Sequence, residues 1–208
     1  MGRDHHSEHL GTLVEGGGAT VAKWESEMIF DYANFYDAVI DDCPRGSRVV
    51  EVGTYIGESL SHLAVGAYPK KLQVIGVDWG VTIEKVDAAT ARATVKPYVN
   101  TLVDNILKTH IPGGIPIILW DSAYAARLIS NRSCRFVYID ADHNYHAVYR
   151  DLLAWMPKIQ RGGILAGHDY DWPTVKAAVD EVFGPCQSSI NPRVWSVRRT
   201  FFGWKPCL

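Results

Sequence analysis

The chain is organised around the segment Arg48-Val49-Val50-Glu51-Val52-Gly53-Thr54-Tyr55-Ile56-Gly57-Glu58-Ser59. A run rich in β-branched valines ends there, two glycines follow at positions 53 and 57, and a helical pattern begins at Ser59. This order predicts a buried strand, a tight turn and the start of a helix. Because glycine has no Cβ, a ligand can approach the backbone of the turn, and the helix N-terminus offers N–H donors. We therefore expect a small polar ligand to bind at this turn.

On both sides of this segment, short β-branched runs alternate with helical patterns. Strands are predicted at 48–52, 72–78, 115–120, 135–140 and 162–169, and an edge hairpin around 194–198. Helices are predicted at 20–42, 58–67, 83–110 (in two pieces broken near Pro97), 123–130, 144–156 and 174–183. This alternation is typical of a parallel sheet covered by helices on both faces. We predict a single doubly wound, Rossmann-like α/β domain over residues 19–208, with a mostly parallel seven-stranded sheet, an antiparallel edge hairpin and an N-terminal helix. Residues 1–18 are predicted to be a flexible tail.

Composition narrows the class of protein. The chain has 208 residues, of which 47% are hydrophobic and 21% charged, as expected for one globular domain. A net charge of −2 argues against a nucleic-acid partner. The four scattered cysteines predict a reducing compartment rather than a zinc site or a disulfide framework. No secretory leader or membrane-spanning apolar run is evident, so a cytoplasmic protein without a membrane partner is expected.

Polar residues follow the predicted strands at or near their ends. In an open parallel sheet, ligands bind beyond the carboxyl ends of the strands. An individual acid at such a place could be a helix N-cap, but the whole set in phase with the sheet favours a binding site. The set consists of Glu51, Asp78, Asp121, Asp140, His168 and Asp169.

Several of these motifs together resemble a known family. The glycine turn is similar to the first motif of class I S-adenosylmethionine (SAM) methyltransferases. The stretches around Ile139-Asp140-Ala141-Asp142 and Gly167-His168-Asp169 resemble the macrocin-type sugar O-methyltransferases (methyltransferase family 24). The resemblance covers about residues 47–183. It implies a SAM-dependent methyltransferase that acts on an oxygen of a small molecule, such as a sugar or another hydroxylated metabolite, and it suggests a homodimer.

The resemblance also implies roles for the polar residues in binding SAM. Asp78 would accept the ribose hydroxyls, and Trp79 would either stack on the base or pack in the structure. The adenine edge would meet Asp121 and Ser122. The methionine end would lie near the glycine turn. The cofactor-binding residues predicted in this way are Glu51, Gly53, Thr54, Tyr55, Gly57, Ser59, Asp78, Trp79, Asp121, Ser122 and Asp140.

For the chemical step, the resemblance implies a divalent ion held by Asp140, His168 and Asp169, with Asp142 as a substitute. The imidazole of His168 stands where many relatives have an oxygen ligand, which leaves Mg²⁺, Mn²⁺, Fe²⁺ or no metal open. Alternatively His168 or His143 acts as the general base, since imidazole titrates near neutral pH. Asp140, His143 and His168 are thus the predicted catalytic residues.

Two other functions are compatible with the same fold. One is a nicotinamide-dependent oxidoreductase, although the third glycine of the dinucleotide fingerprint is missing. The other is a non-catalytic module that binds SAM or a nucleotide. Binding of SAM without turnover of any acceptor would favour the module.

Overall fold

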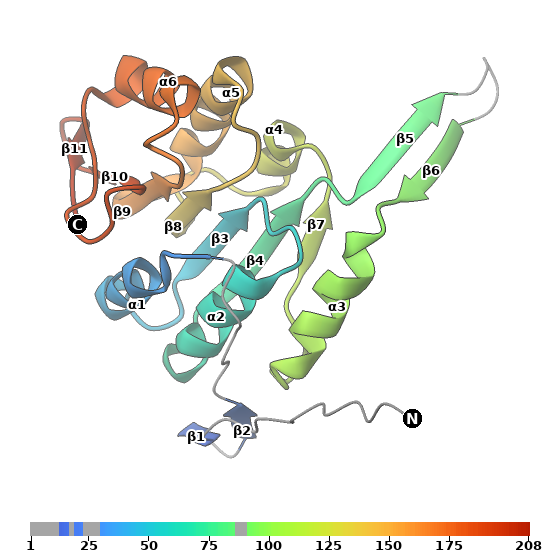
Figure 1. The fold of residues 1–208 in the computed structure, drawn as a ribbon. Helices are drawn as coiled ribbons and strands as arrows, with labels where there is room; N and C mark the ends of the chain where they lie inside the picture. The colour runs from blue at the N-terminus through green and yellow to red at the C-terminus, as the bar shows by residue number, and fades with distance from the viewer. Residues whose placement is uncertain (1–12, 17–18, 23–29, 86–90) are drawn as a thin grey trace, which may run out of the picture.

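The computed structural model describes residues 13–16, 19–22, 30–85 and 91–208. Its centre is a seven-stranded sheet in the order β11-β10-β9-β8-β3-β4-β7 (Figure 1). The strands are β3 (Arg48–Val52), β4 (Gln73–Asp78), β7 (Ile117–Leu119), β8 (Cys134–Ile139), β9 (Ile159–Gly167), β10 (Trp195–Arg199) and β11 (Trp204–Pro206). The first five run parallel, and β10 and β11 are antiparallel at one edge. This arrangement confirms the predicted Rossmann-like sheet and its edge hairpin.

Helices cover both faces of the sheet (Figure 1). One face carries α4 (Ser122–Ala125), α5 (Tyr145–Trp155) and α6 (Pro173–Phe183), and the other carries α1 (Ala33–Asp42), α2 (Glu58–Ala67) and α3 (Tyr98–Lys108). Single 3₁₀ turns lie at Tyr68–Lys70, Ala126–Leu128 and Met156–Lys158. No helix in the described part of the chain is long and apolar enough to cross a membrane.

Successive side chains of each strand point to opposite faces of the sheet, and this produces a hydrophobic core on each face. Val50 packs with α5 and α6, whereas its neighbour Val49 packs with α1 and α2. Side chains of successive strand residues point to opposite faces, so a continuous apolar run fills both layers. Glu51 therefore points to the same face as Val49, toward α1 and α2.

Strand order reverses between β3 and β8, and Gly53 lies at this point. Its φ is +90°, and a Cβ built on it would lie 1.9 Å from the backbone oxygen of Asp140. Only glycine allows the turn after β3 to approach the end of β8 so closely. This crevice is where the doubly wound fold is expected to bind its ligand.

The segment before α3 differs from the prediction. Helix was predicted over 83–110, but among the described residues of this range only those of α3 are helical, and β5 (Val81–Lys85) pairs with β6 (Ala91–Val95) as an antiparallel hairpin. β-branched residues at 81–83 and 94–95 favour strands over helix. The first helical piece of that prediction is wrong, and residues 86–90 lie outside the described residues.

The N-terminal region also differs. β1 (Leu13–Gly16) pairs with β2 (Ala19–Ala22), so the predicted helix does not begin at Thr20. Among the described residues the helix starts at Ala33, and residues 23–29 lie outside them. Of the predicted tail, residues 1–12 and 17–18 also lie outside the described residues.

Candidate active site

Two adjoining cavities lie at the carboxyl ends of the parallel strands. The first has a volume of about 420 Å³ and the second about 330 Å³. The first lies over the ends of β4 and β7, and the second extends toward the start of α2 and the residues before α1. Both are lined by Gly53, Tyr55, Asp140, Ala141 and His143. The residues at the strand-order reversal thus form the boundary where the two cavities meet.

Asp78 lines the first cavity and also holds the glycine turn. Its Oδ2 accepts hydrogen bonds from the backbone N–H groups of Thr54 (2.9 Å) and Tyr55 (2.8 Å). Its Oδ1 accepts one from the Tyr98 hydroxyl at 2.5 Å. Asp78 therefore ties the turn to α3, a role that the sequence did not reveal. Its contact with a ribose stays a prediction.

Aromatic side chains form the outer part of the first cavity. Trp79 and Trp120 are 58% and 51% exposed, so each presents a ring face that is available to a ligand. Asp121 caps α4 by accepting from the N–H groups of Ala123 and Tyr124, and it pairs with Arg150 at 2.8 Å. Asp121 is therefore a helix N-cap, which the sequence offered as the alternative to a binding role. Asp121 and Ser122 also line the cavity.

Glu51 lies behind the second cavity and does not line it. Its carboxylate is fully buried and accepts hydrogen bonds from Ser59 Oγ (2.5 Å) and the Tyr36 hydroxyl (3.0 Å). Of the predicted cofactor-binding residues, this cavity is lined by Gly53, Thr54, Tyr55, Ser59 and Asp140. Gly57, with φ +79°, is the N-cap of α2. A direct contact of Glu51 with a cofactor stays a prediction.

We expect Glu51 to make stability fall as pH rises. Burial raises the pKa of Glu51 to about 8, and the hydrogen bonds from Ser59 and Tyr36 only partly offset it. The folded state therefore holds a proton that the unfolded state releases near its ordinary pKa, so this contribution is full below about pH 4.5 and is lost by about pH 8. The loss is on the order of 3–5 kcal/mol. Urea unfolding at pH 5, 6.5 and 8 should show a steeper decline in the wild type than in Glu51→Gln. The pKa of Asp151, raised by burial to about 6, adds the same smaller decline to both proteins. Parallel declines in both proteins would contradict it.

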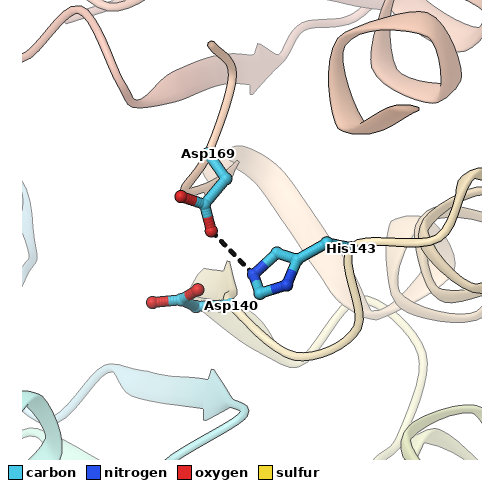
Figure 2. A group of neighbouring side chains, drawn as sticks. All are labelled: Asp140, His143 and Asp169. Carbon is cyan, nitrogen blue, oxygen red and sulfur yellow. Dashed lines mark ion pairs between the residues drawn. The ribbon is translucent and has the colours of Figure 1, made fainter. Parts of the chain in front are cut away.

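Asp140 and His143 line both cavities, and Asp169, which lines neither, lies beside them (Figure 2). His143 Nε2 lies 2.7 Å from Asp169 Oδ2, and one ligand atom from each residue lies within 4.8 Å of the others. Asp140 follows β8, His143 lies in the loop before α5, and Asp169 follows β9. Two carboxylates and an imidazole in this arrangement can orient a proton acceptor or hold a divalent ion.

His168 lies between two acids of the site. Its Nε2 lies 2.8 Å from Asp31 Oδ1 and its Nδ1 lies 3.2 Å from Asp169 Oδ1, so acids occupy both ring nitrogens. Burial alone would lower the pKa of His168, but the bond to Asp169 and the charges of Asp140, Asp169 and Asp31 raise it. One geometric group of possible ligands contains Asp140, His143 and Asp169, and His168 lines the second cavity. The role of His168 as a metal ligand or base stays a prediction.

Three residues at this site carried no functional signal in the sequence. Arg193 pairs with Asp169 at 2.7 Å and with Asp31 at 3.0 Å, and the Tyr32 hydroxyl donates to Asp140 Oδ2 at 2.9 Å. Burial raises the pKa of Asp169, but His168, His143 and Arg193 lower it below its ordinary value, so this carboxylate stays ionised. Asp31, Tyr32 and Arg193 are distant in sequence from the motifs, and only the fold brings them to the site.

The chain matches a family model described as a methyltransferase domain over residues 50–170, which is more than half of its length. It therefore belongs to this methyltransferase family, as the motifs at the strand ends predicted. The protein is a class I SAM-dependent methyltransferase with a Rossmann-like fold. No curated protein matches the chain significantly.

Several solved structures share the fold. CalS11, a TDP-rhamnose 3'-O-methyltransferase of calicheamicin biosynthesis, is 18% identical with a TM-score of 0.54, and the match covers 80% of this chain and 76% of CalS11. The methyltransferase PaMTH1 of Podospora anserina, bound to S-adenosylhomocysteine (SAH), is 12% identical with a TM-score of 0.61. The match covers 86% of this chain and 80% of PaMTH1. An O-methyltransferase of Bacillus cereus in complex with SAH is 12% identical with a TM-score of 0.52. The match covers 72% of this chain and 67% of the Bacillus enzyme. At these identities the likeness concerns the fold.

Proposed function

We propose that the protein is an O-methyltransferase that transfers the methyl group of SAM to a hydroxyl of a small molecule. The observation that carries this proposal is that two cavities meet at Gly53, Asp140 and His143, and that the imidazole of His143 pairs with the Asp169 carboxylate behind it. SAM would place its adenosine in the first cavity, among Asp78, Trp79 and Asp121. The acceptor would enter the second cavity beside Phe30 and Tyr32. O-methyltransferases among the structures of this fold favour oxygen as the acceptor atom.

His143 is the general base in this proposal. Asp169 accepts from its Nε2, which leaves Nδ1 as the nitrogen that takes the proton. The acceptor oxygen forms a bond to the methyl carbon while the carbon–sulfur bond of SAM breaks, and the hydroxyl proton passes to His143. The Trp172 ring lies 4.6 Å from the His143 ring, centroid to centroid, and helps to hold its orientation. The remaining contribution of the protein is alignment of the two substrates.

A divalent ion is the second candidate for activating the hydroxyl, because Asp140, His143 and Asp169 place three ligand atoms within 4.8 Å. One imidazole with two carboxylates fits Mn²⁺ or Fe²⁺ better than Mg²⁺. Such an ion would lower the pKa of the acceptor hydroxyl. Activity that survives metal stripping favours His143 as the base. Activity that is lost on stripping and returns with Mn²⁺ favours the ion.

Calorimetric titration with SAH tests the cofactor, and Asp78→Asn should weaken SAH binding. Asparagine has one acceptor oxygen in place of two. If that oxygen keeps the N–H groups of Thr54 and Tyr55, the amide NH2 takes the place of the oxygen that now accepts from Tyr98, so the negative charge and the second acceptor that a ribose would meet are lost. We expect about a tenfold to hundredfold loss of affinity. Tyr98→Phe is the matched control: it removes one hydrogen bond to the same carboxylate and should cost less.

NAD is the contrasting ligand in the same titration. Binding of NAD in place of SAH would contradict the proposed cofactor. Binding of SAH without turnover on a panel of hydroxylated acceptors would instead favour the non-catalytic module.

A further inference from the structure

Residues 191–208 carry four basic side chains and no acidic one, and the active site accounts for only part of this charge. Arg193 pairs with the acids of that site, and Arg198 pairs with Asp42 at 2.9 Å. Arg199 instead lines a separate cavity of about 330 Å³. Its lining residues lie near the start of β9 and in the β10–β11 hairpin, which forms the edge of the sheet in Figure 1. SAM is proposed to bind beyond the opposite ends of the strands.

Three arginines line this cavity: Arg132 before β8, Arg161 on β9 and Arg199 on β10. Among the described residues, the arginines that form ion pairs are Arg135, Arg150, Arg193 and Arg198, so none of the three has a carboxylate partner. Gathering three like charges without a counter-charge costs free energy, which a bound anion would recover.

Side-chain contacts hold two of these arginines beside the cavity. Arg199 donates to the backbone oxygen of Ile159 at 2.5 Å, and the Arg161 guanidinium lies 4.3 Å from the centroid of the Phe201 ring. The turn at 200–203 is closed by a hydrogen bond from Thr200 N to Gly203 O at 2.7 Å. Phe201 remains 69% exposed, and Trp204 forms another wall. An aromatic ring beside clustered guanidinium groups suits a ligand that has both an anionic group and a flat ring.

We propose that this cavity binds a small phosphorylated molecule with a planar ring, of the class of a nucleoside diphosphate, at a site separate from the methyl-transfer site. The phosphates bind between Arg132, Arg161 and Arg199, because guanidinium forks match phosphate oxygens in pairs. The ring stacks against Phe201 or Trp204. This site does not depend on which acceptor the enzyme methylates.

The test is calorimetric titration with UDP and with inorganic pyrophosphate, on the whole chain. UDP is expected to bind, and more tightly than pyrophosphate because of the ring. Arg132→Gln and Arg161→Gln should each weaken UDP roughly tenfold to a hundredfold, without a change in SAH affinity. Arg45→Gln is the matched control, since this exposed arginine lies outside the cavity and donates to the backbone oxygen of Pro69. Thermal melting checks that each variant is folded.

Three results would overturn the proposal. Failure of UDP to bind at millimolar concentration would show that the cavity is not a binding site for this class of ligand. An equal loss of UDP affinity in Arg45→Gln would show that UDP is attracted by the positive charge of the surface in general and not by this cavity. Binding of a hexaglutamate peptide without binding of UDP would assign the cluster to an acidic protein partner instead. Equal affinities for UDP and pyrophosphate would overturn the part of the proposal that concerns the ring.

Discussion

Replacement of Gly53 by alanine is expected to destabilise the protein more than any other single change at the site. The added Cβ would lie 1.9 Å from the backbone oxygen of Asp140 and 2.4 Å from its carbonyl carbon. These are backbone atoms at the end of a central strand, so they cannot move aside as a flexible side chain could. We expect a loss of about 4 kcal/mol or more in the free energy of unfolding. Urea unfolding followed by circular dichroism measures it.

Gly113→Ala is the control variant. It separates the cost of the steric clash at position 53 from the cost of a left-handed backbone conformation. Gly113 has a similar φ of +84°, but a Cβ there meets nothing within 4 Å. Alanine should therefore cost only the left-handed strain, about 1–2 kcal/mol. Equal losses in the two variants would show that the approach of the glycine turn to Asp140 is not what requires glycine at position 53.

Replacement of His143 by alanine is expected to give the largest loss of activity with the fold retained. His143 lines both cavities and is held by Asp169, so its loss removes the proposed base while the glycine turn stays intact. General base catalysis contributes about 10²- to 10⁴-fold, and we expect kcat for methyl transfer to fall by that factor. SAH affinity should change little. Single-turnover transfer of radiolabelled methyl from SAM measures the rate.

His168→Gln is the comparison variant. His168 lies between Asp31 and Asp169, so this change should disturb the contact with the segment before α1 and lower kcat less than His143→Ala. A larger loss for His168→Gln would transfer the role of base to His168. Titration of both variants with Mn²⁺ adds a readout that does not depend on turnover: only His143→Ala should weaken binding if the histidine is a metal ligand.

Much of the fold could be predicted because its signals are local. The valines of 48–52 and the glycines after them predict a strand and a turn, and Pro157 and Gly184 lie near helix ends. The residues 81–95 misled the prediction because a pattern of mixed polar and β-branched residues suits a helix or a hairpin, and pairing with another strand decided for the hairpin. The same applies to Ala19–Ala22, which pairs with Leu13–Gly16.

The two histidines show where sequence reasoning about the site stops. Both His143 and His168 follow strands whose ends meet at the same edge, so both were candidates for the base. Their different surroundings depend on Asp31, which is 137 residues away from His168 in sequence. A local pattern carries no information about such a contact.

The sequence by itself determined the class of fold, the edge of the sheet at which ligands bind and the set of acids at that edge. These follow from strand periodicity and from the position of glycines and acids relative to strand ends, which are properties of neighbouring residues. Only the tertiary structure decided which groups meet: Arg193 with Asp169, Tyr32 with Asp140, Asp78 with the glycine turn, and both His143 and His168 with Asp169. The physical reason is that hydrogen bonds and ion pairs act over a few ångströms in space, and the packing of distant segments sets which side chains come within that range.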